Sequence, residues 1–338
     1  MVRYPQYHRR VRLLVFGGLR GKRHHGNFRF SAFRSKTGDA PSGRCAVKIV
    51  YIGSPSSLSY IPLRALIAAG RSVVAIAVEG QRKSALHNPK FPVLVERSTA
   101  LASLALLHAI PLIELVGDWS VAVERLARIA PDVILVSCFG RKLPDNIVSI
   151  PRYGCFNLHP SLLPTFRGPA PVFWQFRAGV ESFGISLHWV TAEIDAGDVV
   201  AQTRVTMPDG VNGHQANSRL AEAGSRLVEA TMCSIEGGSL KRCAQSHGDA
   251  SYQGFPSPDD YAVNTRWTAR RMYNFICATR SPGIVFPCGV DGRIYRLTEA
   301  KSYRDGGRVG VGTAVEGSII SINCRPGVVE AVCAAGGE

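Results

Sequence analysis

Several familiar signals are missing from this chain of 338 residues. No window approaches the roughly 20 uncharged apolar residues that a membrane span needs, so we do not expect an integral membrane protein. The nine cysteines form no C-x-x-C pair, and their odd number and wide spacing indicate neither a disulfide framework nor a zinc site. No G-x-G-x-x-G motif supports NAD or FAD, and no H-x-x-x-H spacing supports a metal. We expect a reducing compartment and no metal.

Acidic residues are nearly absent from positions 1–44. This segment holds 11 lysines and arginines but only one acid, Asp39, so its net charge is 11 − 1 = +10. The rest of the chain carries 29 basic and 24 acidic residues, or +5. Because the segment lacks hydrophobic periodicity, we expect an unstructured extension or a start placed too far upstream. The alternatives are an organelle transit peptide and a basic arm that contacts nucleic acid. Without a transit peptide, the expected location is cytoplasmic.

The remaining composition is that of a folded protein. Hydrophobic residues make up 46% of the chain and charged residues 19%, which argues against disorder over most of its length. At roughly 150 residues per domain, the length predicts two domains. We expect a leader at 1–44, an α/β domain at 45–237, a linker at 238–260 and a small domain at 261–338.

Between residues 47 and 235, short apolar runs alternate with segments of helical periodicity. Residues 47–52 and 132–138 are nearly continuous apolar runs of the kind that form buried strands. Strands that alternate with helices of this length predict βαβ units and a mainly parallel sheet. The other expected strands are 73–78, 111–114, 155–158 and 185–190, and the expected helices are 61–67, 101–108, 121–129 and 220–235.

The pattern changes after residue 237. Glycine, serine, proline and aspartate are dense over 237–260, which indicates a linker. One helix is expected at about 265–278, followed by short strands between glycine turns. Few helices and many short strands predict a small β-barrel, which we expect to lack part of its last strand. The expected strands are 284–286, 293–300, 317–322 and 328–332.

Asn157 and His159 give the first indication of a functional site. They alternate at the end of an expected strand, so their side chains point to the same face. This end is the carboxyl edge of the expected parallel sheet, where open α/β sheets bind ligands. A loop stiffened by prolines follows, and Asp195 comes after the next expected strand.

An asparagine, a histidine and an aspartate at one sheet edge can catalyse acyl transfer without a protein nucleophile. The Asn157 amide can donate to a developing oxyanion. His159 can move protons. Asp195 can orient His159 and stabilise its charged form, which raises the pKa of the histidine.

The combined motifs resemble the 10-formyltetrahydrofolate-dependent formyltransferases. The stretch NLHPSLLPTFRGPAP is followed by EIDAGDVVAQ, with the aspartate 195 − 159 = 36 positions after the histidine. VKIVYIGSP at the first strand and VSCFGRKLP at 136–144 extend the resemblance. From about Tyr252 the chain is similar to the barrel of methionyl-tRNA formyltransferases and of amino-sugar-nucleotide formyltransferases. The resemblance implies a Rossmann-like formyltransferase domain and an OB-like barrel over about residues 46–332.

The resemblance also implies roles for individual residues. Asn157 would bind the formyl oxygen, His159 would assist proton transfer, and Asp195 would hold the geometry of the site. The donor would be 10-formyltetrahydrofolate. The residues assigned to the folate pocket are Phe139, Gly140, Arg141, Lys142, Leu143, Ser161, Leu162, Leu163, Pro164, Ala192, Glu193 and Ile194, and those on the acceptor side are Gly53, Ser54, Arg167 and Gly168.

The identity of the acceptor stays open at the level of sequence. Methionyl-tRNA formyltransferases commonly have glycine at the position of Pro160, and GISLHWV looks more like the amino-sugar group. EGQRKSALHNPKF lacks the Gly-Lys-rich insert of the tRNA group but keeps Arg82, Lys83 and Lys90.

Residues 249–338 hold 10 basic and 9 acidic residues, a weak basic face for a tRNA-binding barrel. Arg266, Arg270 and Arg271 could still track phosphates. We favour methionyl-tRNA, with an amino-sugar nucleotide and a non-catalytic folate or nucleic-acid binder as alternatives. We expect a monomer.

Overall fold

The computed structural model describes residues 46–80, 99–117, 119–307, 314–316 and 318–334. The basic leader lies outside the described residues. Arg82, Lys83 and Lys90 also lie outside them, so their expected role is not addressed by the structure.

A seven-stranded sheet forms the first half, with strand order β3-β2-β1-β4-β5-β6-β7. The pairs from β3 to β5 are parallel, whereas β6 and β7 are antiparallel to their neighbours. The prediction of a mainly parallel sheet is therefore confirmed. The strands are β1 (Ile49–Gly53), β2 (Val73–Glu79), β3 (Leu112–Leu115), β4 (Val133–Ser137), β5 (Gly154–His159), β6 (Phe183–Trp189) and β7 (Val199–Val205).

Helices cover this sheet, and their contacts explain the continuous apolar runs in the sequence. Every residue of β1 and of β4 is buried, as expected for strands enclosed on both faces. α1 and α6 pack against each other, and a capping box between Asn212 and Gln215 starts α6. The helices are α1 (Ser57–Ala68), α2 (Thr99–Leu107), α3 (Ser120–Ile129), α4 (Asp145–Val148), α5 (Pro171–Ala178) and α6 (Gly213–Glu236).

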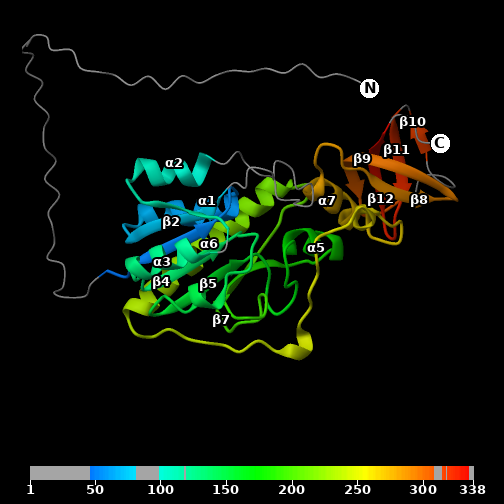
Figure 1. The fold of residues 1–338 in the computed structure, drawn as a ribbon. Helices are drawn as coiled ribbons and strands as arrows, with labels where there is room; N and C mark the ends of the chain where they lie inside the picture. The colour runs from blue at the N-terminus through cyan, green and yellow to red at the C-terminus, as the bar shows by residue number, and fades with distance from the viewer. Residues whose placement is uncertain (1–45, 81–98, 118, 308–313, 317, 335–338) are drawn as a thin grey trace, which may run out of the picture. The chain divides into compact units, whose positions relative to one another are not determined.

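A second sheet, of five antiparallel strands, follows the helix α7 (Ala269–Thr279), and its strands are orange to red in Figure 1. Its order is β10-β11-β12-β9-β8, which agrees with a small barrel domain. Its strands are β8 (Phe286–Val290), β9 (Arg293–Arg304), β10 (Ala314–Glu316), β11 (Ile319–Asn323) and β12 (Val328–Cys333).

An aromatic cluster joins α5 to the second sheet. The ring of Phe173 lies 5.1 Å from that of Tyr261 and 5.4 Å from that of Phe275, centroid to centroid. Phe286 of β8 contacts both Tyr261 and Phe275 at 5.9 Å. All four rings are buried, so the cluster is a shared apolar core between α5, α7 and β8.

Five elements differ from the sequence prediction, among them the short α4 and β10, which were not predicted. The strand expected at 284–286 was wrong in position, since β8 begins where that range ends. α5 was not predicted, and it begins at Pro171, the last residue of the expected Pro-rich loop; this proline occupies the first turn, where a missing N–H costs nothing. β7 has a half-exposed pattern without a clear apolar face, and it was missed.

Candidate active site

The structure brings Asn157, His159 and Asp195 together. Asn157 and His159 lie on β5, and Asp195 lies in the loop between β6 and β7. Asn157 Nδ2 donates to Asp195 Oδ1 at 3.2 Å. His159 Nδ1 lies 3.5 Å from Asp195 Oδ2. The three side chains predicted from strand alternation and spacing therefore form one contact cluster.

The Asp195 carboxylate is held in its ionised form. Gly168 N–H donates to Oδ2 at 2.9 Å. Burial raises the pKa of Asp195, but the nearby charge of His159, a hydrogen bond from His188 and the Gly168 N–H outweigh that effect. The pKa of Asp195 therefore lies below its ordinary value, and the site keeps a fixed negative charge near neutral pH.

Two effects shift the pKa of His159 in opposite directions. Burial lowers its pKa below the ordinary 6.5, whereas the Asp195 carboxylate raises it. Burial is the larger effect, so the net shift is downward. Asp195 raises the pKa of His159, as predicted, but the cost of burying a charged imidazole is larger and was not anticipated.

Both ring nitrogens of His159 face oxygen acceptors. Nδ1 faces Asp195, and Nε2 lies 2.8 Å from the Phe166 carbonyl oxygen. A carbonyl oxygen can only accept, so Nε2 carries a proton in this arrangement. Phe166 itself has a backbone φ of +58°, an unusual value for a bulky residue.

His188 joins the cluster and was missed as a site residue. Its Nε2 lies 3.4 Å from Asp195 Oδ1 and 3.2 Å from Asn157 Nδ2. It is 2% exposed. His188 sits directly opposite Asn157 in the antiparallel β5–β6 pair, so only knowledge of that pairing would have located it.

The loop after His159 is fixed by buried hydroxyls and an amide. Ser161 Oγ donates to Thr165 O at 2.7 Å, and Ser186 Oγ donates to Ser161 O at 2.7 Å. Gln202 donates to Leu163 O at 3.1 Å. Leu162 and Pro164 lie between these anchors. This loop therefore has a defined shape beside the cluster.

Arg167 and Gly168 border the cluster on the other side of the loop. Arg167 is 9% exposed, and its guanidinium donates to the Gln245 side-chain oxygen at 2.7 and 3.1 Å. Gly168 has φ +112°, and a Cβ there would lie 2.1 Å from Gln253 O, so the position requires glycine.

Gly53 and Ser54 lie at the same sheet edge as the cluster. Gly53 pairs with Ser137, which in turn pairs with Leu158, so the ends of β1, β4 and β5 are level. Ser54 N–H donates to Ser59 Oγ at 3.1 Å.

The expected folate-pocket segments 139–143 and 192–194 contain both exposed and buried residues. The Arg141 guanidinium lies 4.2 Å from the centre of the Trp119 ring, and the Phe139 ring meets Trp119 edge-on. Gly140 and Lys142 are exposed, whereas Leu143 is buried in the core, so its side chain supports the loop from below. Ala192, Glu193 and Ile194 are exposed.

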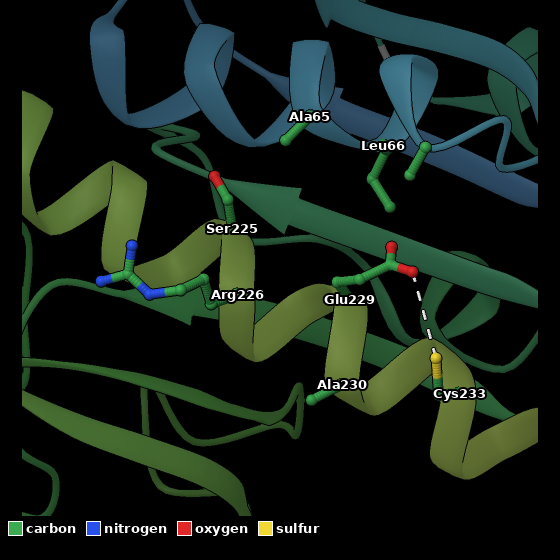
Figure 2. A pocket seen from close by; sticks show the side chains of 8 residues that line it. Ala65, Leu66, Ser225, Arg226, Glu229, Ala230 and Cys233 are labelled. Atoms are coloured by element: carbon green, nitrogen blue, oxygen red, sulfur yellow. Dashed lines mark hydrogen bonds between the residues drawn. The ribbon is translucent and has the colours of Figure 1, made fainter.

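A groove of about 470 Å³ lies elsewhere, between α1 and α6. Figure 2 shows Ala65 and Leu66 of α1 above Glu229 and Cys233 of α6. No predicted site residue lines this groove, so it says nothing about the chemistry of the cluster. Among the described residues, no group of three His, Cys, Asp or Glu side chains could hold a metal.

Comparison with known proteins agrees with the motif analysis. Residues 118–231 match the family model described as "Formyl transferase". A methionyl-tRNA formyltransferase of Halalkalibacterium halodurans is 31% identical over 236 residues, 68% of this chain and 71% of that protein. Another, of Moorella thermoacetica, is 30% identical over 269 residues, 78% of this chain and 84% of that protein.

The fold has a solved counterpart. An N-formyltransferase from Helicobacter canadensis superposes with a TM-score of 0.64 and 15% identity, covering 85% of this chain and all of that one. A mainly parallel α/β sheet with polar side chains at its carboxyl edge defines the class of the fold. The sequence relatives define the family: the chain belongs to the formyl transferases. It is a formyltransferase, an enzyme that moves a one-carbon acyl group.

No helix among the described residues has the length and apolar character to span a bilayer.

Proposed function

We propose that the protein transfers the formyl group of 10-formyltetrahydrofolate to the amino group of methionyl-tRNA. The observation that carries the chemistry is the contact cluster of Asn157, His159 and Asp195. The acceptor is supported by relatives named methionyl-tRNA formyltransferase at 30 and 31% identity.

The proposed reaction needs three events at the formyl carbon. The acceptor amine attacks this carbon, the bond to folate N10 breaks, and the proton lost by the amine reaches N10. The Asn157 amide stabilises the oxyanion of the tetrahedral intermediate. His159 carries the proton, and the charge of Asp195 supports the protonated form of His159.

The donor is proposed to lie along the carboxyl edge of the first sheet. The segment 139–143 and the exposed residues 192–194 flank the cluster along the chain. The fixed loop around Ser161 and Leu163 would shape the space beside the reacting carbon. The Helicobacter canadensis protein was solved with folinic acid, which supports a folate donor for this fold.

An amino-sugar nucleotide is the second candidate acceptor. The Helicobacter canadensis complex also contains dTDP-3-aminofucose. In this chain, Arg270 pairs with Asp209 at 2.8 Å, and Arg271 stacks on Trp267 at 4.0 Å. Two of the three arginines expected to track tRNA phosphates therefore already have intramolecular partners.

Parallel formylation assays with methionyl-tRNA and with an amino-sugar nucleotide test the acceptor. With tRNA, the apparent affinity should fall steeply with salt, with a log–log slope of several units, because many phosphates are engaged. A sugar nucleotide presents about two phosphates and gives a shallow slope. Formylation of the sugar nucleotide alone would overturn the tRNA proposal.

Two substitutions test the chemistry independently of the acceptor. Asn157→Ala and His159→Ala should each lower kcat by about 10²–10⁴-fold and leave folate binding nearly intact, because both act on the transition state. Near-normal turnover in either variant would remove the proposed mechanism.

The proposal includes an organisation of the whole chain. We propose a catalytic domain at 45–237, a connecting segment at 238–260 and an acceptor-binding domain at 261–338. We propose a monomer located in the cytoplasm.

A further inference from the structure

The segment 243–253, expected to be a linker, lies against the two loops of the candidate site. Cys243 pairs with Val199 through two backbone hydrogen bonds of 2.8 and 2.9 Å. Ser251 O accepts from Arg167 N at 2.9 Å, and Ser251 Oγ accepts from Phe166 N at 2.8 Å. The segment is therefore bound both to the strand after Asp195 and to the loop after His159.

Gln245 lies between these two anchor points and uses its whole side-chain amide. Its Nε2 donates to Asp195 O at 2.9 Å and to Gly197 O at 2.6 Å. Its Oε1 accepts from Arg167 Nε at 3.1 Å and from Arg167 Nη2 at 2.7 Å. A primary amide has two hydrogens and two lone pairs, so all four are used.

These four bonds connect groups that are costly to leave without partners. Arg167 is a buried charge held by a neutral oxygen, and a buried donor that loses its acceptor costs its full desolvation. Asp195 has a backbone φ of +54°, a strained value for a residue other than glycine. The direction of its carboxylate depends on that backbone, and Gln245 holds the carbonyl of the same residue.

We infer that Gln245 is a positioning residue for formyl transfer. It fixes the Asp195 loop relative to the Arg167 loop, so that the carboxylate meets His159 and the Gly168 N–H together. It acts through Asp195 and Arg167. The inference rests on the formyl-transfer chemistry proposed above for His159 and Asp195.

Three variants separate positioning from folding. Gln245→Ala removes all four bonds, and Gln245→Glu keeps an oxygen for Arg167 but sets a carboxylate against the two carbonyls. Gln215→Met removes the bond that the Gln215 side chain accepts from Asn212 N–H in the capping box of α6, a bond that involves no residue of the cluster, and serves as the destabilised control.

Both Gln245 variants should lower kcat about 10–100-fold and change the folate KM less than about threefold, because displacement of a catalytic group by about 1 Å costs up to about 10²-fold. The control should lose thermal stability and keep its kcat. Full activity of Gln245→Glu would overturn the inference, because the N–H bonds to the Asp195 loop would then be dispensable.

A double-mutant cycle shows whether Gln245 acts through Asp195. In an Asp195→Asn background, Gln245→Ala should lower kcat less than about threefold further, because the group it aligns is already altered. If the fold-losses in kcat of the two single variants multiply in the double variant, Gln245 acts independently of Asp195 as a structural residue, and the inference is wrong.

A second cycle needs no substrate and remains informative if the acceptor proposal is wrong. Arg167→Ala and Gln245→Ala should each lower the midpoint of urea unfolding, and the double variant should lower it by less than the sum. If the two midpoint shifts are fully additive in the double variant, the contact between these side chains carries no coupling energy. If the unmodified enzyme does not formylate methionyl-tRNA, the proposed function is wrong, but the result of this unfolding cycle is unaffected.

Discussion

Asn157 and His188 face each other across the β5–β6 pair, with 3.2 Å between Asn157 Nδ2 and His188 Nε2. His188 Nδ1 lies 2.7 Å from the carbonyl oxygen of Trp189, which can only accept, so Nδ1 carries a proton. Nε2 faces both the Asn157 amide and Asp195 Oδ1, at 3.2 and 3.4 Å, and the same amide nitrogen donates to Asp195 Oδ1 at 3.2 Å. A flipped amide would set its oxygen against that carboxylate, so the orientation is fixed by charge.

This geometry predicts a difference between two His188 variants. His188→Gln keeps a polar group near the position of Nε2, whereas His188→Asn keeps one only near Nδ1. We expect the Asn variant to lose about tenfold in kcat, the order of one misaligned hydrogen bond in the transition state, and the Gln variant to lose much less. Steady-state kinetics with folate binding as a control measures this. Equal losses would show that His188 acts by packing alone.

The pH dependence of activity should move when Asp195 is neutralised. His159 must be neutral to take a proton, and burial places its pKa below 6.5, so the acid limb of kcat/KM should lie below pH 6.5. Asp195 raises that pKa, so Asp195→Asn should move the limb to lower pH while the maximal rate falls. A limb that stays in place would show that the carboxylate does not act on His159.

Arg271 should behave as a structural residue. Its guanidinium stacks on Trp267, and it donates to the Arg177 carbonyl at 2.9 Å, so α7 is tied to α5. We expect Arg271→Ala to destabilise the protein by about 1–3 kcal/mol, from lost stacking and an unsatisfied carbonyl. Thermal unfolding measures this.

The exposed Arg266 is the better probe of tRNA binding, and Arg266→Ala should weaken tRNA binding without a comparable loss of stability. The opposite pattern, a stable Arg271→Ala with weakened tRNA binding, would restore the expectation that the paired arginines contact phosphates.

Deletion of residues 1–44 should leave a folded, active enzyme. The first core strand begins at Ile49, and the leader has no apolar periodicity to bury. Circular dichroism and a formylation assay of the shortened chain check this. Aggregation or inactivity would mean that the leader packs on the folded part.

The strand that carries Asn157 and His159, and the buried strands beside it, were accessible to sequence analysis because their signals are local. A buried parallel strand is a continuous apolar run, and alternation along β5 places these two side chains on one face. His188 and Gln245 were not accessible in the same way. His188 meets Asn157 only through an antiparallel pairing between strands 31 positions apart, and Gln245 lies in a segment whose composition indicates a linker. Long-range pairing of this kind leaves no periodic trace in one sequence.

The aromatic cluster around Phe173 has a consequence for any attempt to divide the protein. A fragment that ends near residue 260 would present Phe173 to water, having lost the rings of Tyr261 and Phe275 that cover it. Exposed aromatic surface of this size promotes association. An exchange of C-terminal modules between relatives would therefore need to transfer aromatic side chains that fit against Phe173, because α5 packs on them in this protein.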